Sequence, residues 1–572
     1  MRLPHAIVWT AALGFLPPGP RAAEEADGCL LDGPRSAVFP AAARDWLLDP
    51  AASAPPAVWP LPRQVWLKST HGPRLRWLEH ARPLAGERPW SGWRKDGLAL
   101  AAGPRLESSA WSFSGEHPGS LSEGANGLDL ELARDGALGA WLHMRDAGVS
   151  GDSLPRTLPL WRERESWLWS QVQDDGSLTH DEARAGLGLV LPLGGARAHV
   201  SLVREHLRWG PGLLRTTEIQ GDRAPSLPMF LLQAEAGPFY FSQAVGELFS
   251  GEADTVLARR DATGLVKVPW REKWLAAHRL DIRGAWGGLG LGEILVLGDR
   301  GPGPGALIPT GLLWSEQHAA GDRDNVLVFL DGRLRLPRAL PGAWQVYGEL
   351  CVDDYSISDW GQDLEGQKIA SLAGLSGCPL PAAGGPSGSA AMQLGSLRLP
   401  GLSWLTVEHT RVRPYFGTHF FAADRYDHGG RALGATPEPN TRATDWEWRH
   451  EAPGPRLRLG RLALDGQWTA RLGGGHLVHG ANPPGGNVGG DRLLPWREGI
   501  DDPRAPFLAG RRETTREWRT GLEARWRVDW RGRGLGSLAL EMGWTRQHFA
   551  AAGASATVET LREGRLRWVS PF

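Results

Sequence analysis

The chain has 572 residues and a formal net charge of −1, so no global field draws it to nucleic acid, which is excluded as a default partner. Its cysteines, Cys29, Cys351 and Cys378, are too few for a disulfide framework and lack zinc-site spacing. Cys351 and Cys378 could pair after export or stay unpaired. The length permits one large β-barrel. Twenty-nine tryptophans against five tyrosines favour the aromatic girdles of a membrane barrel over an ordinary core.

The chain begins with the pattern of a secretory signal. Arg2 precedes the apolar run Ala6–Leu16, and Ala22 and Ala23 supply small residues where cleavage is expected. This run is too short to cross a bilayer, and no later stretch supplies about 18 consecutive apolar residues. We therefore predict an exported chain with a signal peptide over 1–23 and no helical membrane span.

The pattern changes about one fifth of the way along the chain. Residues 24–105 are irregular, with the proline-rich stretch APPAVWPLP and short apolar stretches such as ARDWLL that predict brief helices. We expect a periplasmic or plug segment there, and a barrel over 106–572, where strand-like runs recur. Three Gly/Pro-rich stretches that start at Asp299, Cys378 and Gly473 predict long surface loops.

The stretch GLEARWRVDW, residues 521–530, shows the strand pattern most clearly. Its apolar residues alternate without a miss against Glu523, Arg525, Arg527 and Asp529. A period of two places the two sets on opposite faces of one strand. In a soluble sandwich the apolar face would point inward, whereas in an outer-membrane barrel it faces lipid and the charges line a watery lumen.

Enzyme signatures are missing from the sequence. There is no G-x-S-x-G elbow, H-E-x-x-H, C-x-x-C or Walker loop. The glycines around Gly288 indicate a narrow place in a sheet rather than a nucleotide site. His476 and His479 lie three residues apart in a glycine-rich stretch, where a solvated loop is favoured over a metal site. Asp353 and Asp354 are adjacent, so on a strand they point to opposite faces and form no acid/base pair.

Six segments, in this order, carry information beyond the strand pattern, and together they resemble the capsule assembly Wzi family. The most specific pieces are the Arg-Trp-Gly-Pro run at 208–211, the run that starts at Tyr347, and Glu-His-Thr-Arg at 408–411. The chain also ends on Phe572, and bacterial outer-membrane barrels usually end on an aromatic residue. The segments are REHLRWGPG (204–212), HRLDIR (278–283), DNVLVFLDG (324–332), YGELCVDDYS (347–356), TVEHTRVRPYFGTH (406–419) and HGGRALGATPEPN (428–440).

The resemblance implies a fold class and a role. The fold is an all-β, transmembrane antiparallel barrel of about eighteen strands, with a small, partly helical N-terminal plug segment and loops that occlude the other end. The role is lectin-like, tethering capsular or exopolysaccharide at the cell surface, and no catalytic residues come with it.

Candidate polysaccharide-binding residues follow from strand periodicity. In REHLRW, Arg204, His206 and Arg208 share one face, opposite Leu207 and Trp209, so we expect this basic trio to point into the lumen. The planar forks of arginine can grip the carboxylates of uronate sugars.

A second set lies in YGELCVDDY, where Tyr347, Glu349 and Asp353 share a face opposite Leu350 and Val352. We expect these side chains to point into the lumen too, where carboxylates can accept hydrogen bonds from sugar hydroxyls. The alternative for both sets is that they pair with each other or with the plug and stabilise a filled lumen.

The sequence therefore predicts a monomeric, non-enzymatic barrel in the outer membrane, with no metal and no cofactor. Its expected partners are capsular or exopolysaccharide, outer-membrane lipid and the polysaccharide export machinery. A diffusion channel is the alternative, because a barrel of this size could hold open water. An outer-membrane hydrolase ranks third, since no nucleophile constellation is present.

Overall fold

The computed structural model describes residues 58–59, 91–95, 98–115, 118–134, 138–152, 169–214, 217–221, 224–260, 266–319, 321, 323–336, 342–355, 367–379, 391–394, 397–434, 437–501, 506–530, 533–552 and 555–570. The predicted signal peptide, most of the predicted plug segment, Cys29 and Phe572 lie outside these residues. Within them, no helix has the length and apolar character needed to cross a membrane.

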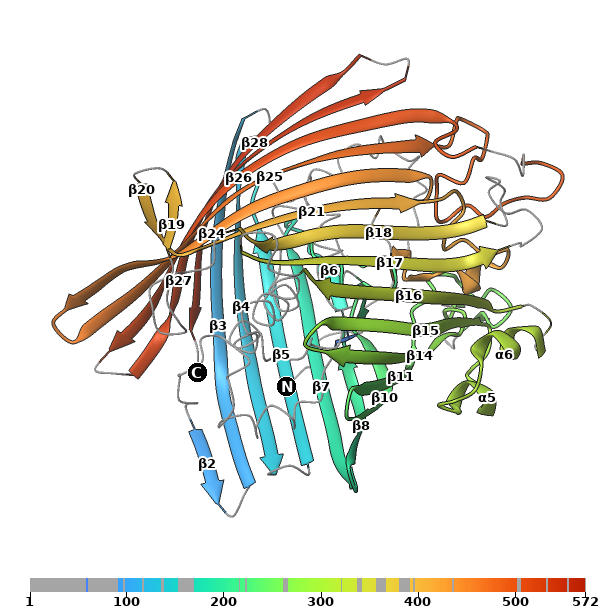
Figure 1. Cartoon of the computed structure of the whole chain (residues 1–572), viewed down its shortest axis with the longest axis horizontal. Helices are drawn as coiled ribbons and strands as arrows, with labels where there is room; N and C mark the ends of the chain where they lie inside the picture. The colour runs from blue at the N-terminus through green and yellow to red at the C-terminus, as the bar shows by residue number, and fades with distance from the viewer. Residues whose placement is uncertain are drawn as a thin grey trace.

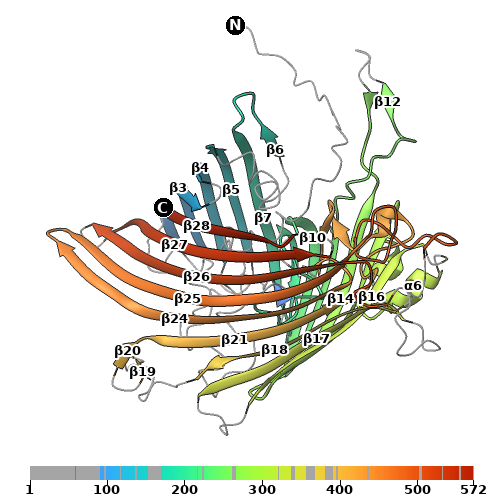
Figure 2. The ribbon, with the colours of Figure 1, turned by 90° about the horizontal axis from the view of Figure 1, so that it is seen from above.

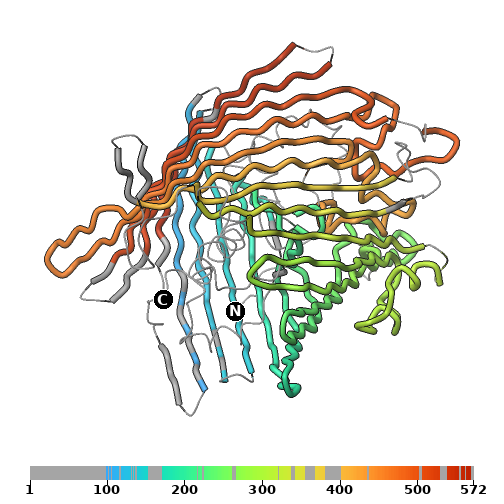
Figure 3. Tube along the Cα trace, in the orientation of Figure 1, coloured from blue at the N-terminus to red at the C-terminus, as the bar shows by residue number. Residues whose placement is uncertain are grey.

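Eighteen strands form one closed antiparallel barrel, in which each strand pairs with the next in chain order and β28 returns to pair with β3 (Figures 1 and 3). The predicted barrel of about eighteen strands is thus confirmed. The strands are β3 (Leu98–Gly115), β4 (Gly119–Arg134), β5 (Leu138–Ser150), β7 (Leu178–Leu193), β8 (Ala196–Glu205), β10 (Leu227–Ala236), β11 (Phe239–Glu247), β14 (Lys273–Gly284), β15 (Gly287–Gly298), β16 (Asn325–Arg335), β17 (Ala343–Tyr355), β18 (Gln367–Cys378), β21 (Leu402–Val412), β24 (Thr441–Leu459), β25 (Leu462–Ala481), β26 (Arg511–Trp530), β27 (Arg533–Ala551) and β28 (Thr557–Ser570).

Shorter elements attach to this wall or lie in its connections. β3 begins at Leu98, ahead of the boundary at 106 expected from the sequence, and β2 and β6 extend β3 and β7. The short elements are β1 (Val58–Trp59), β2 (Ser91–Lys95), β6 (Trp169–Val172), β9 (Arg208–Trp209), β12 (Arg259–Arg260), β13 (Val266–Lys267), α5 (Pro304–Leu307), α6 (Leu313–Ala319), β19 (Ala391–Leu394), β20 (Leu397–Pro400), η4 (Ala422–Asp424), β22 (Asp427–His428) and β23 (Arg431–Ala432).

The two ends of the barrel differ in their connections. β3 starts and β28 finishes at the same end, which we call the short-turn end because its connections are brief, apart from the loop 379–401 that holds β19 and β20. At the long-loop end the connections include 206–226, 248–272, 299–324, 413–440 and 482–510. Outer-membrane barrels have short periplasmic turns and longer extracellular loops. The long-loop end is thus the one that outer-membrane barrels turn to the cell surface.

The wall is apolar outside and polar inside. Leu280, Leu291, Leu330 and Leu350 are register partners in series from β14 to β17, and their exposed fractions are 44%, 55%, 51% and 42%. Strand residues one step away from these, such as Arg279, are buried in the lumen. This is the reverse of a soluble barrel and fits lipid outside.

The structure shows which face of β26 points into the lumen. Leu522 is exposed on the outer face, whereas Glu523 lies among charged partners, 2.6 Å from Arg525 Nη2 and 3.5 Å from Arg471 Nη2. The charged face of this strand is therefore the lumenal one. Val528, on the apolar face, lies close to the turn at 531–532 and is buried rather than exposed.

The predicted loop from Gly473 is wrong over its first part, because Gly473 to Ala481 form the end of β25. The loop begins only after Ala481, so His476 and His479 are strand residues. A methyl group added at Gly474 would lie 3.0 Å from Nε1 of the Trp446 side chain, which occupies that space. Together with the Glu517 carbonyl, 2.9 Å away, this ring leaves room only for glycine at position 474, which serves close packing rather than a turn.

Cys351 and Cys378 are both buried, and neither forms a disulfide. They lie on paired strands, but Cys351 stands opposite Ala370 and Cys378 opposite Ala343. Residues 370 and 378 are eight positions apart on β18, which corresponds to about 27 Å. A disulfide between these two cysteines is excluded by this distance.

Candidate functional site

The connection 206–226 turns into the barrel, and we call it the lumenal loop. Leu207, Trp209 and Ile219 of this loop are buried in one hydrophobic cluster with inward-facing residues of the wall. The Trp209 ring lies 5.9 Å from that of Phe329 on β16, measured between centroids. Within the loop, the Trp209 amide donates to the Gln220 carbonyl at 2.8 Å. The loop therefore occupies the lumen as a packed element.

Glu349 of β17 holds the first side of the lumenal loop. One carboxylate oxygen accepts the Gly212 amide at 2.6 Å, and the other accepts the Glu218 amide at 2.6 Å and the Thr217 hydroxyl at 2.9 Å. These loop amides are outside any strand ladder, and a buried amide without a partner costs free energy. Glu349 satisfies them from the wall.

Glu408 of β21 holds the second side. Its carboxylate accepts the Leu213 amide at 2.5 Å and the Leu214 amide at 3.0 Å. The Tyr347 hydroxyl donates to the same carboxylate at 2.8 Å. Two wall carboxyl groups, Glu349 and Glu408, therefore accept hydrogen bonds from four backbone amides of the loop.

Two residues of the predicted basic trio stabilise the lumenal loop from within. The buried Arg208 guanidinium donates to the Gly212 carbonyl, and the His206 ring nitrogen Nδ1 lies 2.9 Å from the Ala224 carbonyl. On the wall, Asp353 Oδ2 accepts the Gly417 amide at 2.9 Å and so holds the loop 413–440. The structure thus places these side chains between loops and wall.

The prediction that Arg204 shares a lumenal face with His206 and Arg208 is wrong. β8 ends at Glu205. Arg204 is two residues from the exposed Leu202 and shares the outer face of the strand with it. Glu205 instead lies inside, buried, where it accepts a hydrogen bond from Arg184 Nη1 at 3.2 Å. The two-residue period was carried past the end of the strand, and β9 is a separate strand that begins at Arg208.

Tyr347, Glu349 and Asp353 are placed as expected, since all three are buried on the face opposite the exposed Leu350. The sequence brought Tyr347 and Glu349 together correctly, but it gave no sign of their partners in the lumenal loop. Their partners among the described residues are the loops 206–226 and 413–440 and the wall residue Glu408, whereas the plug, the partner expected in the alternative, lies mostly outside these residues.

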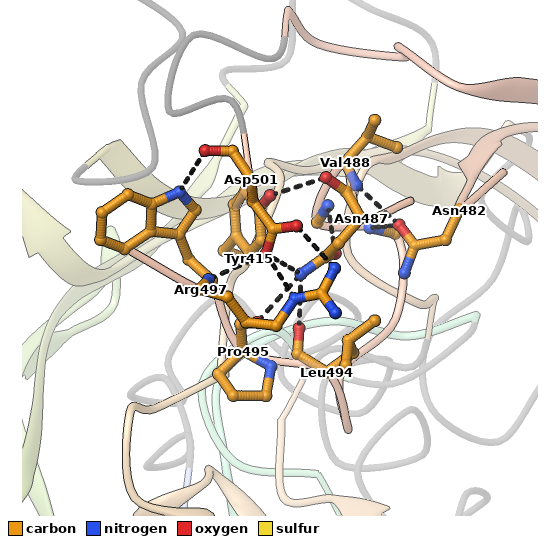
Figure 4. A network of polar contacts seen from close by, with 11 residues as sticks. Tyr415, Asn482, Asn487, Val488, Leu494, Pro495, Arg497 and Asp501 are labelled. Carbon is orange, nitrogen blue, oxygen red and sulfur yellow. Dashed lines mark hydrogen bonds and ion pairs between the residues drawn. The ribbon is translucent and has the colours of Figure 1, made fainter. Parts of the chain in front are cut away.

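A second polar network joins the loops above the lumen (Figure 4). The Asn487 side-chain amide donates to the Pro495 carbonyl at 2.9 Å and to Asp501 at 3.1 Å, while the Asn487 backbone carbonyl accepts the Tyr415 hydroxyl at 3.1 Å. Arg497 Nη2 donates to Asp501 at 2.7 Å, and this hydrogen bond lowers the pKa of Asp501. The loops 413–440 and 482–510 therefore form one fixed surface, which sequence reasoning missed.

Charges of the lumenal wall are paired with one another. The Arg279 guanidinium contacts both oxygens of Asp281, at 2.8 and 2.7 Å, and both oxygens of Asp331, at 2.6 and 3.0 Å. Arg145 Nη2 lies 2.5 Å from Glu123 on the other side of the barrel. Such ion pairs join strands of the wall, and these charged side chains bind one another.

No group of three or more His, Cys, Asp or Glu residues able to hold a metal ion occurs among the residues described.

Comparisons with known proteins concern the fold. No protein-family model and no curated protein sequence matches the chain. A solved structure of Wzi, an Escherichia coli outer-membrane protein involved in group 1 capsule assembly, is similar with a TM-score of 0.49 and 13% identity, over 95% of this chain and 99% of that one. OprD from Pseudomonas aeruginosa is similar with a TM-score of 0.36 and 10% identity, over 85% and 98%. OccAB1 from Acinetobacter baumannii is similar with a TM-score of 0.37 and 9% identity, over 83% of this chain and 96% of that one. A structure of Wzi, whose family the sequence segments resemble, is among the structures to which the fold of this chain is similar.

Proposed function

We propose that this chain is an outer-membrane barrel that binds and retains capsular or exopolysaccharide at the cell surface without enzymatic activity. The observation that carries the proposal is the lumenal loop, held in the barrel by Glu349 and Glu408. A barrel filled in this way presents a fixed loop surface to the outside, which suits binding better than free diffusion. The inverted polarity of the wall supports the membrane location.

The polysaccharide class comes from the sequence segments that resemble the Wzi family. The predicted site residues His206, Arg208, Tyr347, Glu349 and Asp353 act in this proposal by positioning the loops. Sugar is then held by the outer surface of the loops 413–440 and 482–510, which the second network fixes. The export machinery that delivers the polysaccharide is a further proposed partner, and the barrel acts as a monomer.

The experiment compares a deletion strain with its parent, measuring total, cell-bound and shed polysaccharide separately. Loss of attachment with unchanged total synthesis is expected. Complementation with Glu349→Ala plus Glu408→Ala should restore a heat-modifiable barrel in the outer membrane but leave polysaccharide shed. Glu541→Ala is the matched control, because this carboxylate lies on β27 beside Arg565, away from the lumenal loop. Unchanged attachment in the deletion strain would overturn the proposal.

A diffusion channel is the second candidate, favoured by strand number, since barrels of 16–18 strands can enclose an aqueous channel. The filling of the lumen by the lumenal loop opposes it. Stable, large single-channel steps of the purified protein in a planar bilayer would favour the channel over the binding barrel. Shortening of polysaccharide on incubation with the protein would instead favour the hydrolase.

A further inference from the structure

The long connection 299–324 differs from the lumenal loop because it folds onto the outside of the barrel. Its helices α5 and α6 lie outside the strands β14 to β16 in both views (Figures 1 and 2). Ala306 and Leu313 of these helices pack in one buried cluster with Leu295 and Leu297 of β15, and with Ala276 of β14. Leu295 and Leu297 continue the outer face of Leu291. We call this connection the outer helices.

The outer helices cover polar side chains that the wall directs outward. Glu293 shares the outer face of β15 with Leu291, and its carboxylate accepts the Leu313 amide at 2.6 Å. The His278 ring nitrogen Nε2 lies 3.5 Å from the same carboxylate. Gln243 of β11 donates to the Ala306 carbonyl at 3.4 Å. Without the outer helices these polar groups would face lipid, which is costly.

The exposed side of the outer helices carries four large apolar side chains beside the polar Thr310, Ser315 and His318. Leu307, Ile308, Leu312 and Trp314 have exposed fractions of 51%, 50%, 61% and 52%. A surface helix in water normally turns polar residues outward and apolar ones toward the protein. Here the polar groups contact the wall, and leucine, isoleucine and tryptophan are exposed on the side away from it. They lie near the exposed outer-face residues Leu280, Leu291, Leu330 and Leu350, which we call the leucine belt.

We infer that the outer helices are a membrane-contacting element, whose Leu307, Ile308, Leu312 and Trp314 insert into the outer leaflet at the boundary between headgroups and acyl chains. Leu295 and Leu297, on which the helices pack, are four and six residues from Leu291 toward the long-loop end, about 13 and 20 Å along the strand. The helices therefore lie above the leucine belt, at the depth where amphipathic segments and tryptophan concentrate. The inference rests on the proposed membrane location.

The test places a fluorescent bimane label on single cysteines in the full chain, reconstituted in phosphatidylcholine vesicles. Cys29→Ser provides the background, since Cys351 and Cys378 are buried, and its residual labelling is subtracted. Leu312→Cys carries the probe, with Ile308→Cys as a second position. Lipid brominated near the headgroup end of the acyl chain and lipid brominated near its methyl end report membrane contact at the two depths, and iodide reports contact with water.

Two reference positions make the outcomes distinguishable. Leu291→Cys lies in the exposed belt, and Val256→Cys lies in the loop 248–272 with an exposed fraction of 85%. We expect brominated lipid to quench the label at 312 at least about half as strongly as at 291, and hardly at 256. Quenching at 291 but not at 312 or 308 overturns this inference alone. Absence of quenching at 291 by brominated lipid overturns the membrane location. If neither brominated lipid nor iodide quenches the label at 312, a protein partner covers it, and the inference is overturned as well.

Discussion

A charge placed in the leucine belt tests the polarity of the barrel directly. Leu291 lies four residues from the start of β15 at the short-turn end, and its neighbours in the register are Leu280 and Leu330. With a rise of about 3.3 Å per residue and a strand tilt near 40°, four residues raise it about 10 Å above that end. Half of an apolar band about 25 Å tall is similar, so Leu291 lies near the midplane.

Leu291→Arg should therefore lower the free energy of unfolding by about 2–4 kcal/mol, because arginine at the midplane must leave water or distort the bilayer. Val528, which the sequence pattern suggests for such a test, lies near a turn and is buried, so it does not sample the midplane. The assay is urea-dependent folding into lipid vesicles, followed by tryptophan fluorescence. Val256→Arg, on an exposed loop, is the control. Equal losses for Leu291→Arg and Val256→Arg would refute a lipid-facing belt.

Three further predictions concern the loops and the wall. Glu349→Gln combined with Glu408→Gln should speed hydrogen exchange of the lumenal loop amides by at least about tenfold, since each substitution replaces one of two acceptor oxygens by an NH2 group that cannot accept, and unchanged protection would contradict the anchoring. Burial raises the pKa of Asp424 to about 7, so its protonated form stabilises the fold below pH about 4, and this stabilisation is lost as pH rises through 7. The Tm of Asp424→Asn should therefore rise relative to the parent between pH 4 and 8, and a constant difference would argue against the shift. Gly474→Val should impair barrel assembly, measured by heat modifiability, while Gly564→Ala, whose added methyl meets nothing within 4 Å, should not.

The sequence predicted the strand faces well where the alternation runs through the middle of a long strand. Leu522 and Glu523 lie on the expected faces because a period of two allows only two orientations of the strand. All residues of the alternating stretch favour the same one. Tyr347 and Glu349 were placed inward for the same reason. Local pattern is sufficient there, since the wall repeats one geometry.

Prediction failed where tertiary contacts decide the local structure. Arg204 was assigned to the lumen because nothing in REHLRW marks the end of β8 at Glu205. The chain leaves the wall there and is held by Glu349, which lies 137 residues away from Gly212 in sequence. Gly474 was read as a loop residue because the tryptophan that requires its small size belongs to the neighbouring strand.

The long separation between the lumenal loop and its anchors bears on the order of folding. Gly212 and Glu349 are 137 residues apart, and Leu213 and Glu408 are 195 apart. Both anchors come from strands that follow the loop in the chain, so the loop amides gain these partners only when β17 and β21 stand in the wall. Contacts of such range form late, because the entropy of closing the intervening chain must be lost first. A barrel that lacks β21 leaves the Leu213 and Leu214 amides without their carboxylate. The position of this loop in the lumen thus indicates that β21 has joined the barrel wall.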